Sequence, residues 1–434
     1  MKSLRRRQKV VDRIQAIRGM NDVLPEQSLA WQQLEENFKH CLQQYGYQEI
    51  RSPIVESTLL FKRSIGEVTD IVEKEMYTFN DLNGDSLTLR PEGTAGCLRA
   101  CLEHGLLHNQ QQKLWYSGPM FRHEKPQKGR YRQFNQFGVE AIGIAGSAIE
   151  LELIALCWRL WKKLGISNAV SLQINSLGEL AERQLYKERL VAYLIQHSDK
   201  LDDDSKRRLD KNPLRILDSK NSDVRALLNN APKLIDSLGE ESKSAFTNLC
   251  SGLEQMGIAY EINPFLVRGL DYYGHTVFEW VTDQLGSQAT VCAGGRYDAL
   301  VEQLGGNKMP AVGFAMGAER LLLLMEMLTV NAEPRANPSL FMIATTDEGM
   351  RKALIIAEEL RDLKPDWRVI TNTVGGGFKS QFKKADKSGA DFAIIFGEDE
   401  LRNNQVSVKN LRSHAEQLIM PQQQLNQYLQ DYLG

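Results

Sequence analysis

Hydrophobic and polar positions change their period along the chain, and this change predicts which segments are helices and which are strands. Residues 26–45 place apolar side chains at near-helical spacing and predict a helix. Residues 112–124 and 131–143 alternate apolar and polar positions, which predicts two antiparallel strands. The same patterns predict a strand over residues 47–57 with Pro53 inside it, a strand at 86–90 that turns into a helix near Thr94, and a helix over 148–165.

The patterning also predicts how the chain is organised. From about residue 180 to 262 the sequence is charged, helical in period and poor in β-branched residues, which predicts a helical insertion. Strand-like segments resume after it and end at "PAVGFAMGAERLLLLMEML", and residues 329–339 predict a linker because they contain Pro and Asn. Beyond the linker, strands and helices alternate, which predicts a small, separate α/β domain.

Composition narrows the class of protein. A chain of 434 residues with 42% hydrophobic and 25% charged residues predicts a soluble protein of two or three domains. No apolar run approaches the roughly 20 residues that span a bilayer, and the basic N-terminus is not followed by the apolar segment of a secretory signal. Six scattered cysteines without a C-x-x-C pair predict reduced thiols and a cytoplasmic protein, with no metal site.

Three arginines are candidates for binding phosphate. The glycine-rich phosphate loop G-x-x-x-x-G-K-[ST] is absent, whereas a guanidinium offers a planar, permanently charged fork to two phosphate oxygens. Arg122 ends the first hairpin strand, Arg268 lies in the strand-like "LVRGLDYY", and Arg320 lies at a strand–turn–helix junction. Each alone is better explained by a surface salt bridge. Together, in glycine-marked apolar settings, they predict a phosphate site in a protein whose net charge is only −2.

Three polar residues are predicted to be buried beside them. Glu92 lies in "RPEGT", and Gln136 and Glu140 lie in "FNQFGVEAIG". On a regular strand Gln136 and Glu140 face the same way. An unpaired buried carboxylate is costly, so Glu140 needs either a ligand or a cationic partner. The sequence leaves both alternatives open.

Several segments resemble the class II aminoacyl-tRNA synthetases and, within them, the histidyl-tRNA synthetase family. "EIRSPIVE" is similar to motif 1 of the class, "GPMFRHEKPQKGRYRQFNQFGVE" to motif 2, and "VGFAMGAERL" to motif 3. "RGLDYY" and "GGRYDALV" resemble two segments peculiar to the histidine enzyme, and together they are highly specific. The resemblance covers essentially the whole chain.

The resemblance implies an α+β fold, in which a class II synthetase antiparallel sheet flanked by helices carries a helical insertion and is followed by a C-terminal α/β anticodon-binding domain. Motif 1 forms the dimer interface in the class, so we expect a homodimer. The expected segments are the catalytic domain with motifs 1 and 2 (1–178), the helical insertion (179–262), the rest of the catalytic domain with the histidine-specific segments and motif 3 (263–330), and the anticodon-binding domain (331–434).

The resemblance also implies roles in binding ATP. Arg122 and Arg268 are the expected catalytic residues, and both would hold the α-phosphate and the amino acid carboxylate. Phe134 would stack on the adenine, and Arg320 would clamp the γ-phosphate. Mg²⁺ would accompany ATP on its β- and γ-phosphates, and the resemblance implies no protein ligand for a metal.

A second set of residues would bind L-histidine. Glu92, Gly93 and Thr94 would surround its α-amino group. Glu140 and Tyr273 would pair with its two imidazole nitrogens. The pocket would be completed by Gln136 and Tyr272, with Arg122 and Arg268 on the carboxylate.

A third set would contact tRNA(His). The motif 2 loop residues Gln127, Lys128 and Arg130 would reach its acceptor end. Lys379 and Lys383 would lie along the anticodon stem, although from the residues alone a solvated helix face explains these lysines equally well.

Two alternatives remain. One is a regulatory paralogue that partners ATP phosphoribosyltransferase and aminoacylates nothing. Such relatives typically lack the C-terminal domain and have lost motif residues. This sequence contains both the C-terminal domain and the motif residues. The other is a class II synthetase for threonine, proline or glycine, which "RGLDYY" together with Glu140 disfavours.

Overall fold

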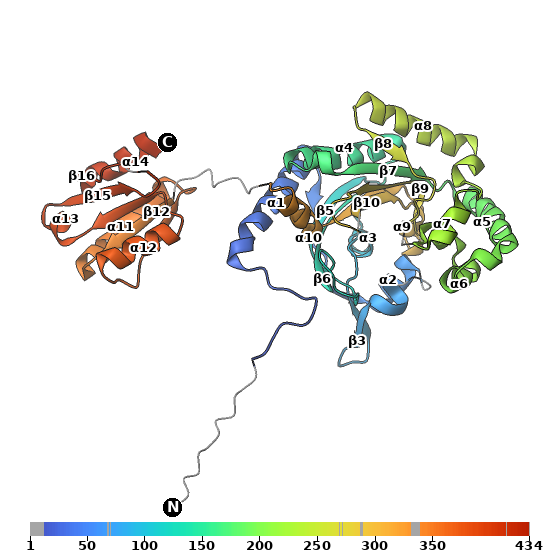
Figure 1. The fold of residues 1–434 in the computed structure, drawn as a ribbon, viewed down its shortest axis with the longest axis horizontal. Coiled ribbons are helices and arrows are strands. Elements are labelled where there is room, and N and C mark those ends of the chain that lie inside the picture. Colours follow the sequence, from blue (N-terminus) through green and yellow to red (C-terminus); the bar gives the residue numbers. More distant parts are fainter. Residues whose placement is uncertain are drawn as a thin grey trace, which may run out of the picture. The chain divides into compact units, whose positions relative to one another are not determined.

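The computed structural model describes residues 13–66, 69, 71–268, 270, 272–286, 290–330, 339–413 and 415–433. The chain forms two compact units, residues 1–332 and 333–434, which are drawn in Figure 1. The first dozen residues and most of the expected linker lie outside the described residues. Among the described residues, no helix combines the length and apolar character needed to cross a membrane.

An eight-stranded sheet forms the centre of the larger unit. Its interior pairs are antiparallel, and only the two edge pairs, β1 with β5 and β7 with β8, are parallel. This confirms the antiparallel sheet expected from the sequence. In sheet order the strands are β1 (Gln48–Glu49), β5 (Gln112–Phe121), β6 (Gln133–Ile142), β11 (Ala311–Gly317), β10 (Thr290–Arg296), β9 (Gly274–Val281), β7 (Ser171–Ser176) and β8 (Tyr260–Ile262).

The side chains of β6 alternate between the two faces of this sheet. Phe137 and Val139 point into one hydrophobic core, which also contains apolar residues of four helices. Gln136 and Glu140 belong to the opposite face, as the sequence predicted, and that face holds the pocket described below. The helices on the first core are α1 (Pro25–Gln44), α4 (Ser147–Lys163), α8 (Glu240–Gln255) and α10 (Ala318–Met327).

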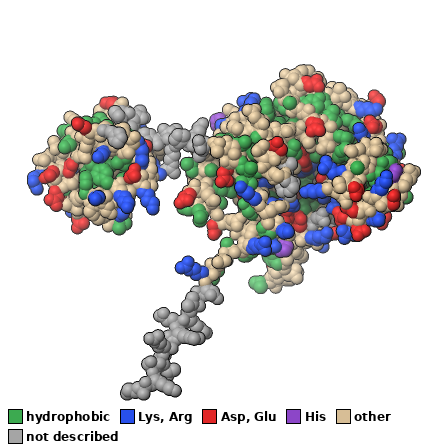
Figure 2. Space-filling view, in the orientation of Figure 1, with side chains coloured by type: hydrophobic (Ala, Val, Ile, Leu, Met, Phe, Trp, Pro, Cys, Tyr) green, Lys and Arg blue, Asp and Glu red, His purple; other side chains and the backbone are tan. Residues whose placement is uncertain are grey.

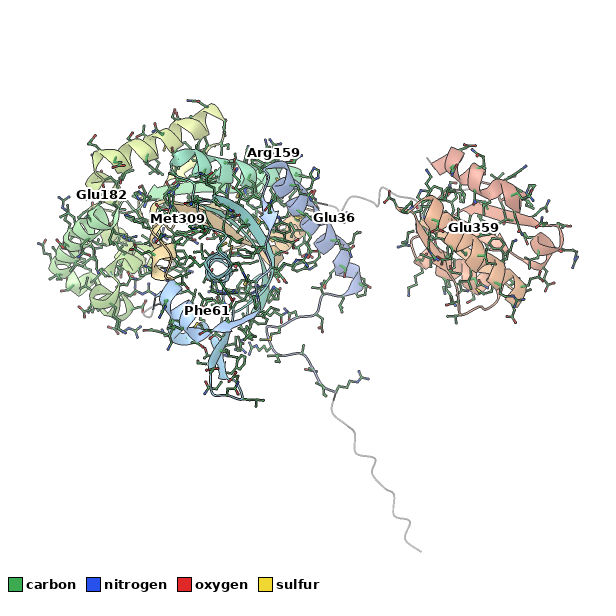
Figure 3. The ribbon with its side chains drawn as sticks, turned by 180° about the vertical axis from the view of Figure 1, so that it is seen from behind. Glu36, Phe61, Arg159, Glu182, Met309 and Glu359 are labelled. Carbon is green, nitrogen blue, oxygen red and sulfur yellow. The ribbon has the colours of Figure 1, made fainter. Side chains whose placement is uncertain are left out.

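A helical region follows β7, where the sequence predicted one. Its described helices are α5 (Leu180–Gln196), α6 (Asp203–Lys211), α7 (Ser222–Leu228) and α8. Glu182, labelled in Figure 3, joins the start of α5 to the start of α8, because its carboxylate accepts hydrogen bonds from Gly239 N and Ser242 Oγ. The last of these helices packs on α4, so the region is continuous with the main core.

Two local predictions were wrong. The strand expected over residues 47–57 is interrupted, since β1 belongs to the large sheet and β2 (Val55–Ser57) to a separate three-stranded sheet with β4 (Ser86–Leu89) and β3 (Tyr77–Asn80). Pro53 lies in the break, and it has no N–H to donate to a strand partner. Arg268 lies on irregular backbone before β9, not on a strand.

The helix predicted from Thr94 is present and is packed on both sides. It is α3 (Thr94–Glu103), which follows β4 through a short turn. Phe61, labelled in Figure 3, lies on α2 (Thr58–Ile65) and packs against Ala95 of α3 in a small hydrophobic cluster. The start of α3 is therefore fixed against the rest of the unit.

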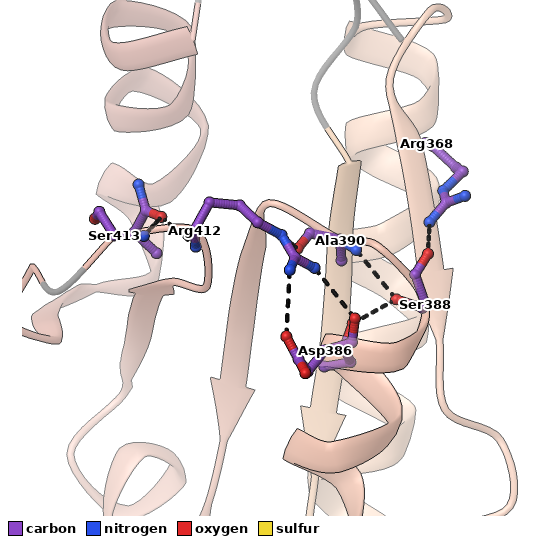
Figure 4. A network of polar contacts seen from close by, with 8 residues as sticks. Arg368, Asp386, Ser388, Ala390, Arg412 and Ser413 are labelled. Atoms are coloured by element: carbon purple, nitrogen blue, oxygen red, sulfur yellow. Dashed lines mark hydrogen bonds and ion pairs between the residues drawn. The ribbon is translucent and has the colours of Figure 1, made fainter. Parts of the chain in front are cut away.

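The smaller unit contains a five-stranded sheet. Its parallel strands and two of its helices follow the predicted alternation, whereas the antiparallel pair β15–β16 was not predicted. In Figure 4 the side chain of Arg412, just after β15, donates to Ala390 O and pairs with Asp386, which ties the end of β15 to helix α12. The strands and α-helices are β12 (Ser339–Ala344), α11 (Asp347–Leu363), β13 (Arg368–Thr371), α12 (Phe378–Lys387), β14 (Phe392–Phe396), α13 (Glu398–Arg402), β15 (Gln405–Asn410), β16 (Leu418–Pro421) and α14 (Leu425–Leu433).

Candidate active site

One pocket brings together residues that are far apart in the sequence. It lies on the face of the sheet to which Gln136 and Glu140 point, and β6, β10 and β11 contribute to its wall. Every residue predicted to bind histidine or ATP lines it, except Gly93. The residues it shares with the prediction are Glu92, Thr94, Arg122, Phe134, Gln136, Glu140, Arg268, Tyr272, Tyr273 and Arg320.

Three guanidinium groups converge in this pocket. The Nε of Arg122 donates to the carbonyl oxygen of Pro91 at 2.8 Å, and its guanidinium carbon lies 5.3 Å from the centroid of the Phe134 ring. Burial lowers the pKa of Arg122, and the nearby Arg268 lowers it further. Burial also lowers the pKa of Arg320 to about 10, with a further contribution from Arg130. Like charges held this close together favour an anionic ligand between them.

Arg130 belongs to this cationic wall. The sequence placed it with Gln127 and Lys128 in a loop that would reach tRNA. In the structure Gln127 and Lys128 are exposed, whereas Arg130 lines the pocket and forms an ion pair with Glu124. The pocket therefore contains four arginines, one more than the ATP and histidine predictions included.

Glu140 is a buried residue of the pocket wall, and hydroxyl groups surround it. Its Oε1 accepts hydrogen bonds from Thr94 Oγ1 at 2.8 Å and from Tyr116 Oη at 3.0 Å, and its Oε2 accepts one from Tyr297 Oη. Among the described residues no cation forms an ion pair with Glu140, so hydroxyl hydrogen bonds stabilise it in place of the buried ion pair that the sequence left open. Burial raises the pKa of Glu140 to about 8, although the three hydroxyl donors oppose that rise.

Glu92 organises the turn before α3. Its two carboxylate oxygens accept hydrogen bonds from the backbone N–H groups of Thr94 and Ala95, at 2.6 and 3.0 Å. These are two of the donors that the first turn of a helix leaves unsatisfied. Burial raises the pKa of Glu92, and these backbone hydrogen bonds oppose the rise. The same carboxylate thus caps the helix and faces the pocket.

Two polar atoms in the pocket have no partner in the described part of the chain. They are Oε1 of Gln136 and Nε of Arg268, both buried. Buried polar atoms in folded proteins nearly always have a hydrogen-bond partner. Their position on the pocket wall indicates that a polar ligand would supply the missing hydrogen-bond partners.

Four residues that shape the pocket were not predicted from the sequence. Tyr116 and Tyr297 donate to Glu140, Glu279 pairs with Arg268, and Glu319 accepts from the backbone and side-chain nitrogens of Asn135. The alternation of β5 indicated the face on which Tyr116 lies, and Tyr297 is part of the quoted "GGRYDALV". No pattern linked either tyrosine to Glu140. Tyr297 directly follows β10, which is far from β6 in the sequence, and Tyr116 is only one of several alternating residues on β5, the strand paired with β6.

The sheet, the pocket and the separate C-terminal unit together define the class II aminoacyl-tRNA synthetase fold. The sequence model described as Histidyl-tRNA synthetase matches residues 19–321, and the one described as Anticodon binding domain matches residues 339–432. The chain belongs to the histidyl-tRNA synthetase family, as its motifs predicted.

Individual relatives agree with this assignment. A histidine–tRNA ligase of Legionella pneumophila (strain Lens) is 68% identical over 425 residues, which cover 98% of this chain and all of the relative. The crystal structure of apo S. aureus histidyl-tRNA synthetase has a TM-score of 0.81 at 38% identity and covers 96% of this chain and 99% of its own.

The regulatory paralogue is not better supported than the synthetase. A Bacillus halodurans C structure described as an ATP phosphoribosyltransferase regulatory subunit/histidyl-tRNA synthetase has a TM-score of 0.62 at 20% identity. It covers 88% of this chain and 97% of its own, and at that identity the likeness shows the fold alone.

Proposed function

We propose that this chain attaches L-histidine to the 3′ end of tRNA(His) in two steps. In the first, the carboxylate of histidine attacks the α-phosphorus of ATP, the bond to the β-phosphate oxygen breaks, and histidyl-adenylate and pyrophosphate form. In the second, the terminal ribose hydroxyl of the tRNA attacks the activated carbonyl and AMP leaves. The observation that carries this proposal is the convergence of arginines beside the buried, hydroxyl-lined Glu140.

Arg122 and Arg268 would catalyse the first step by placing positive charge at the α-phosphate. Phosphoryl transfer of this kind depends on positioning and charge neutralisation more than on covalent chemistry. Both guanidinium groups are already fixed, Arg122 by the carbonyl of Pro91 and Arg268 by Glu279, so little reorganisation is needed when the substrates bind. Arg320 would hold the γ-phosphate, and Phe134 would stack on the adenine.

The other end of the pocket would select histidine. Glu92 and Thr94 would bind the α-amino group, since each oxygen of Glu92 keeps a lone pair after capping α3. Glu140 and Tyr273 would pair with the imidazole nitrogens, and Gln136 and Tyr272 would complete the wall. A site whose polar groups are paired only by the correct substrate rejects analogues by roughly 10⁴–10⁵.

Mg²⁺ would be bound mainly through ATP. Among the described residues there is no group of three or more His, Cys, Asp or Glu side chains that could hold a metal ion. The carboxylates of the pocket already have partners: backbone N–H groups for Glu92, hydroxyls for Glu140, Arg130 for Glu124 and Asn135 for Glu319. Phosphate oxygens and water would therefore supply most of the ligands of the ion.

The tRNA would be bound at two places. The exposed Gln127 and Lys128 would approach its acceptor end, next to the pocket. Lys379 and Lys383 are exposed on α12 of the C-terminal unit and would contact phosphates of the anticodon stem. Over the face drawn in Figure 2, acidic and basic side chains are mixed, so such contacts would be local.

A homodimer would form around motif 1. Four apolar side chains of this region are exposed in a single chain: Ile54, Val55, Leu59 and Phe79. They lie on or next to β2, α2 and β3, and exposed apolar side chains grouped in one region commonly mark a protein interface. We place the reaction in the cytoplasm, where six free, buried cysteines would remain thiols.

The proposal is tested by ATP–pyrophosphate exchange measured with each of the twenty amino acids in turn. Exchange with histidine alone is expected, followed by charging of tRNA(His) in a second assay. Exchange that is fastest with threonine, proline or glycine, or exchange with none of the twenty, would contradict the proposed function.

A further inference from the structure

Tyr116 is held in a slot that only glycine can form. A Cβ atom added at Gly93 would lie 2.1 Å from the ring of Tyr116, and one added at Gly138 would also lie 2.1 Å from it. The ring therefore occupies the space of the missing side chains, between the turn before α3 and strand β6. Tyr116 is 3% exposed, so its hydroxyl is fixed in position by backbone on both sides.

The hydroxyl of Tyr116 is one of three that hold Glu140. A carboxylate has about four lone-pair sites, and it donates no hydrogen bond when it is ionised. Tyr116 and Thr94 fill both sites on Oε1, and Tyr297 fills one on Oε2. One site, on Oε2, is left.

Gly313 keeps the surroundings of Oε2 open. A Cβ atom at this position would lie 1.9 Å from Oε2 of Glu140, and the glycine itself lines the pocket. The fourth lone-pair site of the carboxylate is therefore accessible from the pocket side, where any residue larger than glycine would occupy it.

We propose that Tyr116 and Tyr297 are positioning residues that determine substrate selectivity, because they hold Glu140 as an acceptor with a single site open for an N–H donor. The inference deepens the proposed histidine activation and rests on it. The imidazole N–H of histidine can satisfy the open site. A side chain of similar shape without an N–H would leave a buried carboxylate incompletely paired, which is costly.

The arrangement also makes histidine binding depend on pH. Burial raises the pKa of Glu140 to about 8. Near neutral pH the Glu140 carboxyl is therefore protonated in most molecules of the empty protein, and it must lose that proton before it can accept a hydrogen bond from the substrate. The hydrogen bonds from Tyr297, Thr94 and Tyr116 favour the ionised form. The other titratable groups that interact with Glu140 are Glu92, Cys97, Tyr47, Tyr272 and Tyr273.

The test compares Tyr297→Phe and Tyr116→Phe with the wild type in histidine-dependent ATP–pyrophosphate exchange from pH 6 to 9. Loss of one hydrogen bond to a charged group is expected to raise KM for histidine by roughly 10- to 100-fold, with KM for ATP changed by less than about twofold. Because each hydroxyl lowers the pKa of Glu140, its removal should raise that pKa. The increase of kcat/KM for histidine with pH should therefore occur at higher pH in both variants. Tyr186→Phe is the control, since Tyr186 is equally buried but lies on α5 and is not one of the three described hydroxyl donors to Glu140.

Selectivity provides a second measurement. The wild type is expected to exclude 2-thienylalanine, which has the shape of histidine but no ring N–H, and Tyr297→Phe is expected to discriminate less. Should one phenylalanine variant fail to fold, the other gives the same comparison. If a folded variant keeps the wild-type pH profile and the KM of Tyr186→Phe, the inference is overturned while the proposed function stands. If the wild type itself lacks histidine-dependent exchange, the proposed function fails first.

Discussion

Arg268 and Glu279 form an ion pair at the edge of the pocket, and the second oxygen of Glu279 accepts a hydrogen bond of 2.9 Å from Thr290 Oγ1. The carboxylate is therefore fixed, and it fixes the guanidinium. The Nε of Arg268 is buried without a partner in the described part of the chain. Arg268 is thus a positioned cation with a donor still available for a ligand.

Arg268→Ala is expected to fold and to lose adenylate formation. Removing one fixed group that stabilises transition-state charge costs roughly 10²–10³ in rate, and we expect at least that loss in ATP–pyrophosphate exchange. Arg159→Ala, at an exposed arginine of α4 labelled in Figure 3, is the control and should keep wild-type exchange. Exchange within threefold of the wild type in Arg268→Ala would remove this residue from the mechanism.

Arg320 and Arg130 illustrate the cost of assembling a cationic pocket. Burial and the neighbouring Arg130 both lower the pKa of Arg320, to about 10, so its charge is unfavourable in the empty site. Arg320→Met keeps most of the side-chain volume and removes the charge. We expect KM for ATP to rise roughly 10- to 100-fold, as for a lost hydrogen bond between charged groups. The unfolding temperature of the empty protein should stay the same or rise, and a fall would contradict the electrostatic explanation.

Most of the fold was predictable from the sequence because the period of its apolar residues changes where the elements change. The helices α1, α3 and α4 and the hairpin β5–β6 lie within a few residues of their predicted bounds. The strand expected around Pro53 failed because the apolar pattern continues through the break while the hydrogen bonding does not. The antiparallel pair β15–β16 was missed in a region whose alternation pointed to a purely α/β domain.

The candidate site was predictable only in part. Arg122 and Glu140 could be singled out since charge in an apolar strand is unusual, and the resemblance supplied their expected roles. Tyr116 could not, because a tyrosine in an alternating strand is typical of any core. Its contact with Glu140 depends on the glycines at 93 and 138, which the sequence presents as ordinary turn and strand residues.

The buried Glu140 should also make the empty protein less stable as pH rises. Its folded pKa of about 8 lies above the unfolded value near 4.5, so between these values the folded state binds more protons than the unfolded state. The free energy of unfolding therefore falls with rising pH in this window. Glu92, whose pKa burial also raises, acts in the same direction.

The measurement is the unfolding temperature of the empty protein from pH 5 to 8. The wild type is expected to lose stability over this range, and Glu140→Gln, which cannot ionise, should lose less. The two curves should diverge most at the acidic end if the amide cannot replace the protonated carboxyl, and they should approach one another towards pH 8. Parallel curves would show that Glu140 does not titrate in this window.

Lys379 and Lys383 permit a test that separates tRNA binding from chemistry. Both are exposed on α12, and the proposed contacts of this helix involve tRNA and not ATP or histidine. The double variant Lys379→Ala, Lys383→Ala should therefore keep wild-type ATP–pyrophosphate exchange while KM for tRNA(His) in aminoacylation rises. If both lysines neutralise phosphates, the slope of log K against log salt should become shallower by roughly 1.4–1.8.

A control of equal charge distinguishes specific contacts from net charge. Arg351→Ala, Arg402→Ala removes two exposed cations of the same unit from α11 and α13 (Glu398–Arg402). This variant should retain the wild-type KM for tRNA and the wild-type salt slope. An equal loss in both double variants would mean that the tRNA responds to the overall charge of the unit, and that α12 is only a solvated helix. A loss confined to the lysine variant places phosphate contacts on α12.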